Sequence, residues 1–343
     1  GMDILDKYSP TLRKQILLQY RELMSICIEE YDKKSLALVR KSFDFLLERS
    51  DEDQKINGIH PVGFSTGLAL LAVKELGMDA IGVSASLLLH RVKLNHSSIK
   101  DIASGVGDRT AGIIEEFLKI SDLDTSTTHG QAENMRNLIL TLATDFRVIL
   151  VKIAERLYLM RQMDLLGEKE RIELSCESRF IYSPLAHRLG LYNVMSEMED
   201  ISMSILEKEE YDAIARKLKA SKQKRNRFIR EFVKPLQEDL EREKFKAEIR
   251  GRPKAISSIW RKMKKQKVEF EEVYDKFAIR IIIDTPLKRE KADCWKVYSI
   301  ITDHYQPNPE RLRDWISAPK SNGYESLHTT VVVPGGEWVE VQI

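Results

Sequence analysis

The feature that most constrains the fold of this 343-residue chain is a change in its hydrophobic period part-way along. Up to about residue 195, apolar residues recur at intervals of three and four, as in 16–24, and no alternating strand pattern is visible. After Gly251 the run 277-FAIRIIID-284 is apolar and β-branched, which is typical of a strand. The sequence therefore predicts a helical part followed by an α+β part.

These patterns divide the chain into three segments. We expect an all-α domain over residues 1–195, a charged helical linker over 196–246, and an α+β domain over 247–343. Within the first domain, residues 131–163 are predicted to be helical and mostly apolar on one side.

The α+β part carries further local signals. The runs 328-HTTVVV-333 and 337-EWVEVQI-343 predict two strands, and the Pro-Gly-Gly between them indicates a hairpin. Residues 291–305 predict a helix, and the Gly-Arg-Pro-Lys of 251–254 predicts a turn leading into another helix. Because a strand ends the sequence abruptly, we expect a truncated chain with more domains after Ile343, and we interpret Gly1-Met2 as a tag remnant.

Composition excludes several classes of protein. Hydrophobic residues make up 43% of the chain and charged residues 31%, as in ordinary soluble globular proteins. No apolar run approaches the roughly 18 residues that a membrane span needs. Cys27, Cys176 and Cys294 are far apart and in no metal-binding spacing, which predicts free thiols in a reducing cytoplasm.

Two basic stretches raise the question of an anionic partner. Residues 216–230 hold eight basic residues and no acid, which prompts the hypothesis of nucleic-acid binding. Only Phe228 interleaves as an aromatic residue, so a solvated linker helix is the favoured interpretation. In 251-GRPKAISSIWRKMKKQ-266, the cations Arg252, Lys254 and Lys262 would converge on one anion, helped by a helix N-terminus. The alternative is a solvated basic helix face.

Polar residues around the predicted strands favour a nucleotide site. Asp275 precedes the strand that carries Arg280, and such an acid is a plausible Mg²⁺ ligand beside substrate phosphates. The loop 319-PKSNGYESLHTT-330 offers Tyr324 for stacking on a purine, with a cation and polar groups beside it. Those companions are Lys320, Asn322 and His328.

The last strand alternates polar and apolar residues. Glu340 and Gln342 alternate with Val339, Val341 and Ile343, so a polar row faces solvent or a cleft. A glutamate in such a cleft would serve as a general base. The alternative is an ordinary solvent-facing side chain.

Taken together, these motifs resemble a known family. The order GRPKxxxSIxRKM, YDxxAIR, PKxNGYxSLHTT and EVQI is similar to that of the synthetase domain of the RelA/SpoT family, the long stringent-response alarmone enzymes. In the helical half, 131-QAENMRNL-138, 183-SPLAHRLGL-191 and 196-SEMEDISMSILEKEEY-211 resemble the same family. The resemblance covers nearly the whole chain.

The resemblance implies a nucleotidyltransferase-like mixed sheet that transfers pyrophosphate from ATP to the 3′-hydroxyl of GDP or GTP, giving ppGpp or pppGpp and AMP. It implies Mg²⁺ binding by Asp275, with Glu340 either helping to bind that ion or taking the 3′-hydroxyl proton. The residues implied for ATP are Arg252, Lys254, Ser258, Lys262 and Arg280. Those implied for the acceptor nucleotide are Lys320, Asn322, Tyr324, His328 and Gln342. The basic 311-RLRD-314 leans toward GTP as well as GDP.

For the helical half, the resemblance implies an HD-type hydrolase domain that removes the 3′-pyrophosphate with Mn²⁺, but the required residues are largely replaced. The positions that correspond to its metal-binding and water-activating residues hold His60, His90, Arg91, Leu94, Asn95, Glu155 and Leu159. Only the two histidines match, and Arg91 stands where a carboxylate should neutralise the metal. At about 4 Å and an effective dielectric near 20, that exchange changes the energy by many kcal/mol. We therefore predict an inactive hydrolase domain without Mn²⁺.

Four hypotheses follow from these motifs. The leading one is an active synthetase whose helical half is a scaffold and regulator. The others are a nucleotide-binding regulator without turnover, a residual ppGpp hydrolase that uses Glu155, and a nucleic-acid binder. Contacts with the ribosome and uncharged tRNA are expected only through C-terminal domains that this chain lacks.

Overall fold

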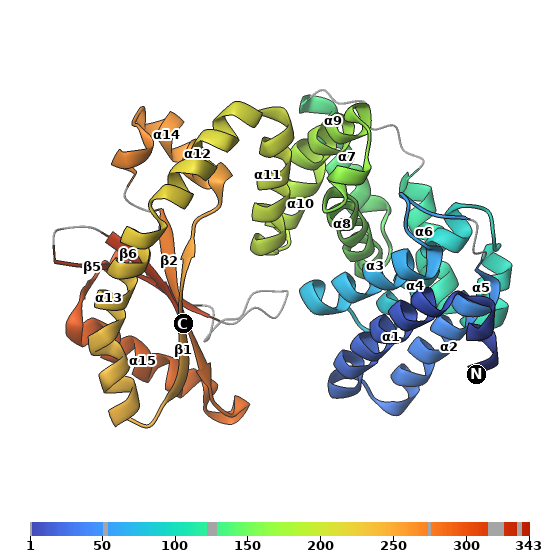
Figure 1. The fold of residues 1–343 in the computed structure, drawn as a ribbon, viewed down its shortest axis with the longest axis horizontal. Helices are drawn as coiled ribbons and strands as arrows, with labels where there is room; N and C mark the ends of the chain where they lie inside the picture. The colour runs from blue at the N-terminus through green and yellow to red at the C-terminus, as the bar shows by residue number, and fades with distance from the viewer. Residues whose placement is uncertain (1, 51–53, 122–128, 274–275, 315–325, 335–337) are drawn as a thin grey trace. The chain divides into compact units, whose positions relative to one another are not determined.

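The computed structural model describes residues 2–50, 54–121, 129–273, 276–314, 326–334 and 338–343. The chain forms two compact units, Gly1–Ala186 and His187–Ile343 (Figure 1). The division lies slightly before the boundary at residue 195 that the sequence suggested.

The first unit is helical, as predicted. Its helices are α1 (Pro10–Glu30), α2 (Lys33–Arg49), α3 (Pro61–Leu76), α4 (Ala80–Lys93), α5 (Ile99–Val106), α6 (Asp108–Ser121), α7 (His129–Leu142), α8 (Phe146–Met160), α9 (Glu168–Glu177) and α10 (Ser183–Arg188), which runs across the division. A π-helical turn, Ser178–Tyr182, joins α9 to α10.

The predicted helix over 131–163 is interrupted. α7 ends at Leu142 and α8 begins at Phe146. Between them, the side chain of Asp145 accepts a hydrogen bond from the backbone N–H of Arg147 at 2.9 Å and so caps α8. Because aspartate satisfies the otherwise unpaired N–H groups of a helix start, the apolar pattern continues across a real break.

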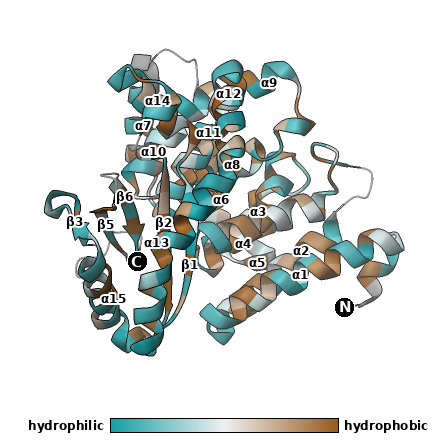
Figure 2. Cartoon of the chain, turned by 60° about the vertical axis from the view of Figure 1, so that its left-hand side comes forward, coloured by the Kyte–Doolittle hydropathy of each residue, from teal (hydrophilic) through white to brown (hydrophobic). Residues whose placement is uncertain are grey.

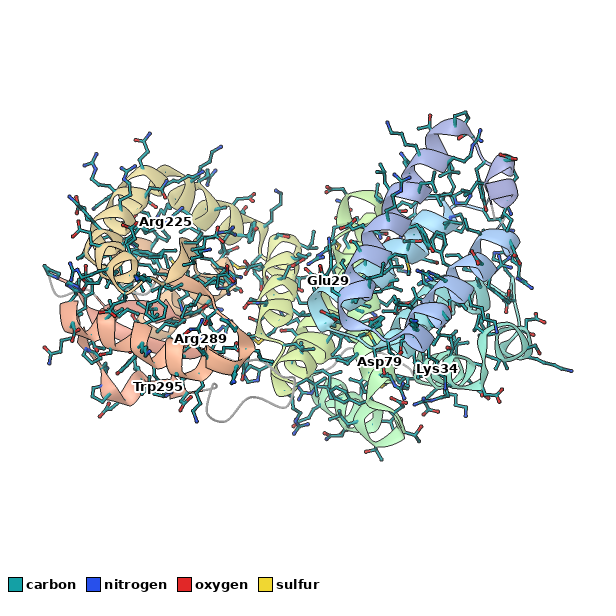
Figure 3. All side chains as sticks on the ribbon, turned by 90° about the horizontal axis from the view of Figure 1, so that it is seen from below. Glu29, Lys34, Asp79, Arg225, Arg289 and Trp295 are labelled. Atoms are coloured by element: carbon teal, nitrogen blue, oxygen red, sulfur yellow. The ribbon has the colours of Figure 1, made fainter. Side chains whose placement is uncertain are left out.

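α4 is the central helix of this unit and is buried along almost its whole length. It begins after Asp79, labelled in Figure 3, whose carboxylate accepts a hydrogen bond from the N–H of Gly82 at 2.9 Å. Just before it, Gly77 ends α3 in the left-handed conformation, with φ of 59°. Hydrophobic residues run along both helices (Figure 2). Because nearly every residue of α4 is buried, neighbouring helices hold this helix, and the polar residues of its last turn are held in a defined place.

The second unit combines helices with a mixed sheet. Its helices are α11 (Tyr192–Leu206), α12 (Lys208–Ala220), α13 (Lys222–Arg242), α14 (Ile256–Gln266) and α15 (Glu290–His304). Its strands are β1 (Lys246–Pro253), β2 (Phe277–Asp284), β3 (Gln306–Pro307), β4 (Arg313–Asp314), β5 (Leu327–Val332) and β6 (Trp338–Gln342).

The strand order is β1-β2-β6-β5-β3, and β4 also pairs with β5. β2 and β6 are parallel, whereas the other pairs are antiparallel, so the mixed sheet is confirmed. The three predicted strands and the helix over 291–305 are present. β1 was missed, and the prediction of a turn at Gly251–Pro253 is wrong. Proline ends this edge strand, which is one of the places in a sheet where it is tolerated.

α13 and α15 cover one face of the sheet (Figure 1). Phe232, Leu236 and Leu240 of α13 are buried against strand residues such as Ile279 and Val341. The segment 196–246 is therefore helical as expected, but its last helix is part of the core rather than a separate linker. Its charged residues lie on the other side of a narrow apolar stripe, which is why the sequence looked like a solvated helix.

None of the helices among the described residues combines the length and apolar character that a membrane span requires. Cys27, Cys176 and Cys294 all lie in described ranges and are free thiols, with Cys27 and Cys294 buried.

Candidate functional site

The helical unit brings together two of the residues predicted at its hydrolase position. His90 lies in the last turn of α4, and its Nε2 is 3.2 Å from Oε2 of Glu155 on α8. Both side chains have only 6% of their surface exposed. Burial alone would raise the pKa of Glu155, but the hydrogen bond with His90 and the charges of Lys93 and Lys152 outweigh it and hold that pKa below its usual range.

A lysine completes this cluster. Nζ of Lys93 lies 3.4 and 3.2 Å from the two carboxylate oxygens of Glu155. Lys93 follows His90 by three positions, so the two side chains leave neighbouring points on one side of α4. The ammonium supplies the carboxylate with the positive charge that a metal ion would otherwise bring. Sequence reasoning missed Lys93, although this helical spacing was a usable signal.

Arg91 points to a different set of partners. Its Nη1 donates to the backbone carbonyl of Arg49 at 2.5 Å, and its Nη2 donates to the carbonyl of His96 at 3.1 Å. Its Nε and Nη2 both donate to the Ser97 hydroxyl, at 3.2 and 3.1 Å. Burial, followed by the charge of Arg49, lowers the pKa of Arg91. The guanidinium therefore holds the loop after α4 against the end of α2.

The other predicted residues of this position do not assemble a metal site. His60 precedes α3, where its Nδ1 accepts a hydrogen bond from the N–H of Val62 at 3.2 Å. Leu94 is 43% exposed, and Asn95 is exposed in the left-handed conformation with φ of 62°. Leu159 is half-buried on α8.

These residues do not fit a Mn²⁺ ion. Across the described part of the chain, no three His, Cys, Asp or Glu side chains are grouped so that they would hold a metal. His90 and Glu155 offer two donors, and the ammonium of Lys93 contacts the same carboxylate that a cation would need. This position therefore offers a metal ion too few ligands, and the one carboxylate is already neutralised by Lys93.

The sheet unit presents a second polar cluster, on the face opposite α13 and α15. Because strand neighbours in register share a face, two rows of side chains cross it. The first row holds Arg252, Ala278, Glu340 and Thr330. The second holds Arg250, Arg280, Gln342, His328 and Arg313. Sequence reasoning named most of these residues and singled out the 311-RLRD-314 motif that contains Arg313. It missed Arg250, whose place depends on the register of a strand that it had not identified.

Glu340 is the centre of this cluster. Its Oε2 forms an ion pair with Nζ of Lys254, which follows β1. Its Oε1 accepts a hydrogen bond from Nε2 of Gln342 at 2.8 Å and lies 3.9 Å from Nδ1 of His328. Nη2 of Arg280 in turn donates to Oε1 of Gln342 at 3.4 Å. Residues predicted for ATP, for the acceptor and for Mg²⁺ thus meet at one carboxylate.

The surroundings of Glu340 keep it ionised. Partial burial would raise its pKa, but the charge and hydrogen bond of Lys254, followed by Gln342 and His328, lower it below its usual range. The side chains of Glu340 and Lys254 are each 20% exposed, so the pair remains open to a ligand. This ionised, partly exposed carboxylate is one ligand of the kind that Mg²⁺ takes beside substrate phosphates, although Lys254 occupies it in this structure.

α14 carries the remaining predicted phosphate contacts. Ser258 and Lys262 are half-buried and four residues apart, so they lie on the same side of this helix. The N-terminus of α14, however, is already occupied. The carboxylate of Asp200 on α11 accepts hydrogen bonds from the N–H groups of Ile256 and Ser257, at 3.2 and 2.9 Å. The expectation that a free helix terminus helps to bind the anion is therefore wrong for these two N–H groups.

Four predicted site residues lie outside the described residues. They are Asp275, Lys320, Asn322 and Tyr324. Their roles in metal and acceptor binding stay predictions.

Two protein families match the chain. A family described as a region found in RelA / SpoT proteins matches residues 251–343, and an HD domain family matches residues 43–192. The chain belongs to the RelA/SpoT family. The RelA/SpoT region encloses the Glu340 cluster, and the HD match encloses His90 and Glu155.

Similar curated proteins of this family carry two different names. A guanosine-3′,5′-bis(diphosphate) 3′-pyrophosphohydrolase from Aquifex aeolicus is 34% identical over 89% of this chain and 43% of its own length. GTP pyrophosphokinases from Streptomyces coelicolor and Escherichia coli are 35% and 36% identical, over 83% and 79% of this chain and 32% and 37% of theirs. This RelA/SpoT chain thus spans less than half the length of these relatives.

Proposed function

We propose that the sheet unit transfers the pyrophosphoryl group of ATP to the 3′-hydroxyl of GDP or GTP, giving ppGpp or pppGpp and AMP. The carrying observation is the Glu340 cluster, in which one ionised carboxylate meets Lys254, Gln342 and His328 on an open sheet face. The names of the GTP pyrophosphokinase relatives support the same activity. We place the reaction in the cytoplasm, where these nucleotides are available.

Group transfer of this kind needs positioning and charge neutralisation more than covalent help. Arg252 and Arg280 are diagonal neighbours on the open face, where they would bind the adenine of ATP. Lys254, Ser258 and Lys262 would hold its phosphates. Mg²⁺, held by Glu340 and by Asp275, would neutralise charge on the pyrophosphoryl group when bound.

Through the Lys254–Glu340 ion pair, bound ATP would change the surroundings of the Glu340 carboxylate. A phosphate oxygen of ATP would compete with Glu340 for the ammonium of Lys254. Once Lys254 turns to the phosphate, Glu340 loses the partner that most lowers its pKa. ATP binding would therefore free the Glu340 carboxylate either for Mg²⁺ or for the proton of the acceptor hydroxyl.

The transfer forms one phosphorus–oxygen bond and breaks another, and both bonds belong to the two bound nucleotides. The acceptor 3′-oxygen bonds to the β-phosphorus of ATP as the bond from that phosphorus to the α-phosphate oxygen breaks. AMP leaves with the electrons of that bond, and the 3′-hydroxyl proton passes to Glu340. Arg313 extends the polar row beside His328, so we propose that GTP is accepted as well as GDP.

For the helical unit we propose no hydrolase activity. The support is the Lys93–Glu155–His90 cluster, which neutralises the one carboxylate of the position internally. The unit would then be a scaffold and regulator. Binding to the ribosome and tRNA stays a prediction about segments outside this chain.

Two parallel assays test this proposal. The chain is incubated with labelled ATP, Mg²⁺ and GDP or GTP, and separately with ppGpp and Mn²⁺, and the nucleotides are separated. We expect ppGpp or pppGpp with AMP in the first assay and intact ppGpp in the second. Nucleotide binding without product would instead support a regulator without turnover, unless residues 196–343 alone restore synthesis. Release of pyrophosphate from ppGpp would contradict the proposal for the helical unit.

A further inference from the structure

The start of α14 is capped by a residue from another helix. An α-helix begins with N–H groups that have no partner inside the helix, and the residue before α14 is Ala255, whose methyl group cannot accept a hydrogen bond. Asp200, in the middle of α11, supplies the cap. Its carboxylate accepts from the N–H groups of Ile256 and Ser257, and also from the Ser257 hydroxyl at 2.6 Å.

This cap fixes the first turn of α14 from outside. Ile259 of α14 is buried against Met203 of α11 and Ile214 of α12, and such apolar contacts hold a helix in place without specifying its rotation closely. Three hydrogen bonds to one carboxylate are directional and charge-assisted, so they specify where the first turn lies. Ser258 follows the capped residues directly, and Lys262 lies one turn further along.

We propose that Asp200 is the positioning residue of the ATP phosphate site, an inference that rests on the proposed function. Its negative charge occupies the end of α14 that would otherwise attract a phosphate. A phosphate at the same N–H groups would be repelled, so the phosphates of ATP are directed to the side chains of Ser258, Lys262 and Lys254. These side chains then set the distance of the phosphate chain from Glu340.

The test compares three substitutions in the full chain. Asp200→Ala removes the cap, whereas Asp200→Asn keeps one oxygen that can accept from Ser257 but loses the charge and the second oxygen, which accepts from the N–H of Ile256. Glu199→Gln is the matched control, because Glu199 lies on the same helix and accepts a hydrogen bond from Nη2 of Arg261 on α14 at 2.7 Å, where 60% of the Arg261 side chain is exposed. Thermal unfolding of each variant checks that it is folded.

The main measurement is calorimetric binding of α,β-methylene ATP, which cannot be cleaved at the reacting bond, with Mg²⁺. Binding of GDP is measured in parallel, and amide hydrogen exchange over residues 254–266 reports the first turn of α14. For Asp200→Ala we expect about 5- to 20-fold weaker binding of the ATP analogue, since a helix cap typically contributes about that factor. We also expect faster exchange in that segment, unchanged GDP binding, a smaller loss of ATP-analogue binding in Asp200→Asn than in Asp200→Ala, and near-normal behaviour of Glu199→Gln.

Two results would overturn the inference. One is binding of the ATP analogue by Asp200→Ala with the affinity of the original chain. The other is an equal loss of ATP-analogue and GDP binding in both Asp200 variants, which would make the residue structural only. If the original chain binds the analogue but forms no alarmone, the proposed function fails while the comparison of the variants still decides the role of Asp200.

Discussion

Each unit contains a cluster of a glutamate, a lysine and a histidine, and the two clusters lie in different environments. In the helical unit, Glu155 is paired with Lys93 and His90, and in the sheet unit Glu340 is paired with Lys254 and approached by His328. In both clusters these partners lower the pKa of the carboxyl group.

The clusters differ in access and in what surrounds them. The Glu155 side chain is 6% exposed, between buried helices, whereas that of Glu340 is 20% exposed on a sheet face that also presents several arginines. The lysines differ in the opposite sense, since 37% of the Lys93 side chain and 20% of the Lys254 side chain are exposed, so the contrast lies in the carboxylates. A ligand can reach the Glu340 carboxylate more readily than that of Glu155. The same residue types are therefore structural in one unit and available for chemistry in the other.

The largest expected effect comes from exchanging each glutamate for its amide. Glu340→Gln removes the negative charge that would hold Mg²⁺ and take the proton, and we expect synthesis to fall by about 10²–10³-fold or more. Glu155→Gln should leave the synthesis rate within about twofold, because a cluster that only holds its own unit together does not touch the substrates. Initial rates of AMP formation measure both, and equal losses in the two variants would contradict the contrast between the units.

A smaller effect is expected on stability from removing the lysine of the closed cluster. Lys93→Met leaves the buried Glu155 carboxylate with His90 as its remaining neighbour in the cluster. We expect a loss of about 1–3 kcal/mol in the free energy of unfolding, less than for a fully buried pair because 37% of the Lys93 side chain is exposed. Urea unfolding measures this loss, and Lys254→Met provides the comparison. A larger loss of stability at Lys254 would show that the sheet cluster is the structural one.

The smallest effect concerns pH. Because the pKa of Glu155 is lower in the folded than in the unfolded chain, the stability it contributes is complete above the unfolded value, about 4.3, and is lost as the pH falls toward the folded value. The stability difference between the original chain and Glu155→Gln should therefore narrow by up to about 1.4 kcal/mol per pH unit below 4.3. Unfolding series at pH 7 and at acidic pH measure it, and a constant difference would show that Glu155 is not held ionised by its partners.

Local patterns were sufficient for most of the architecture. The apolar period predicted the helices of the first unit, and β-branched or alternating runs predicted β2, β5 and β6. β1 escaped because a strand at the edge of a sheet with one polar face can carry charged residues, a glycine and a proline. The break before α8 escaped because capping by Asp145 leaves the apolar pattern unchanged.

By itself, the sequence determined most of the secondary structure, the resemblance to the family, and the residue types at the two candidate sites, including Arg91, Leu94 and Asn95 near His90. Only the tertiary structure decided which charges meet. Lys93 and Glu155 are 62 positions apart, as are Arg280 and Gln342, and Asp200 and Ser257 are 57 apart. Contacts over such separations depend on how helices and strands pack, since neither hydrophobic period nor local propensity records which side chain from a distant element will lie opposite. That packing closed the Glu155 cluster and left the Glu340 cluster open.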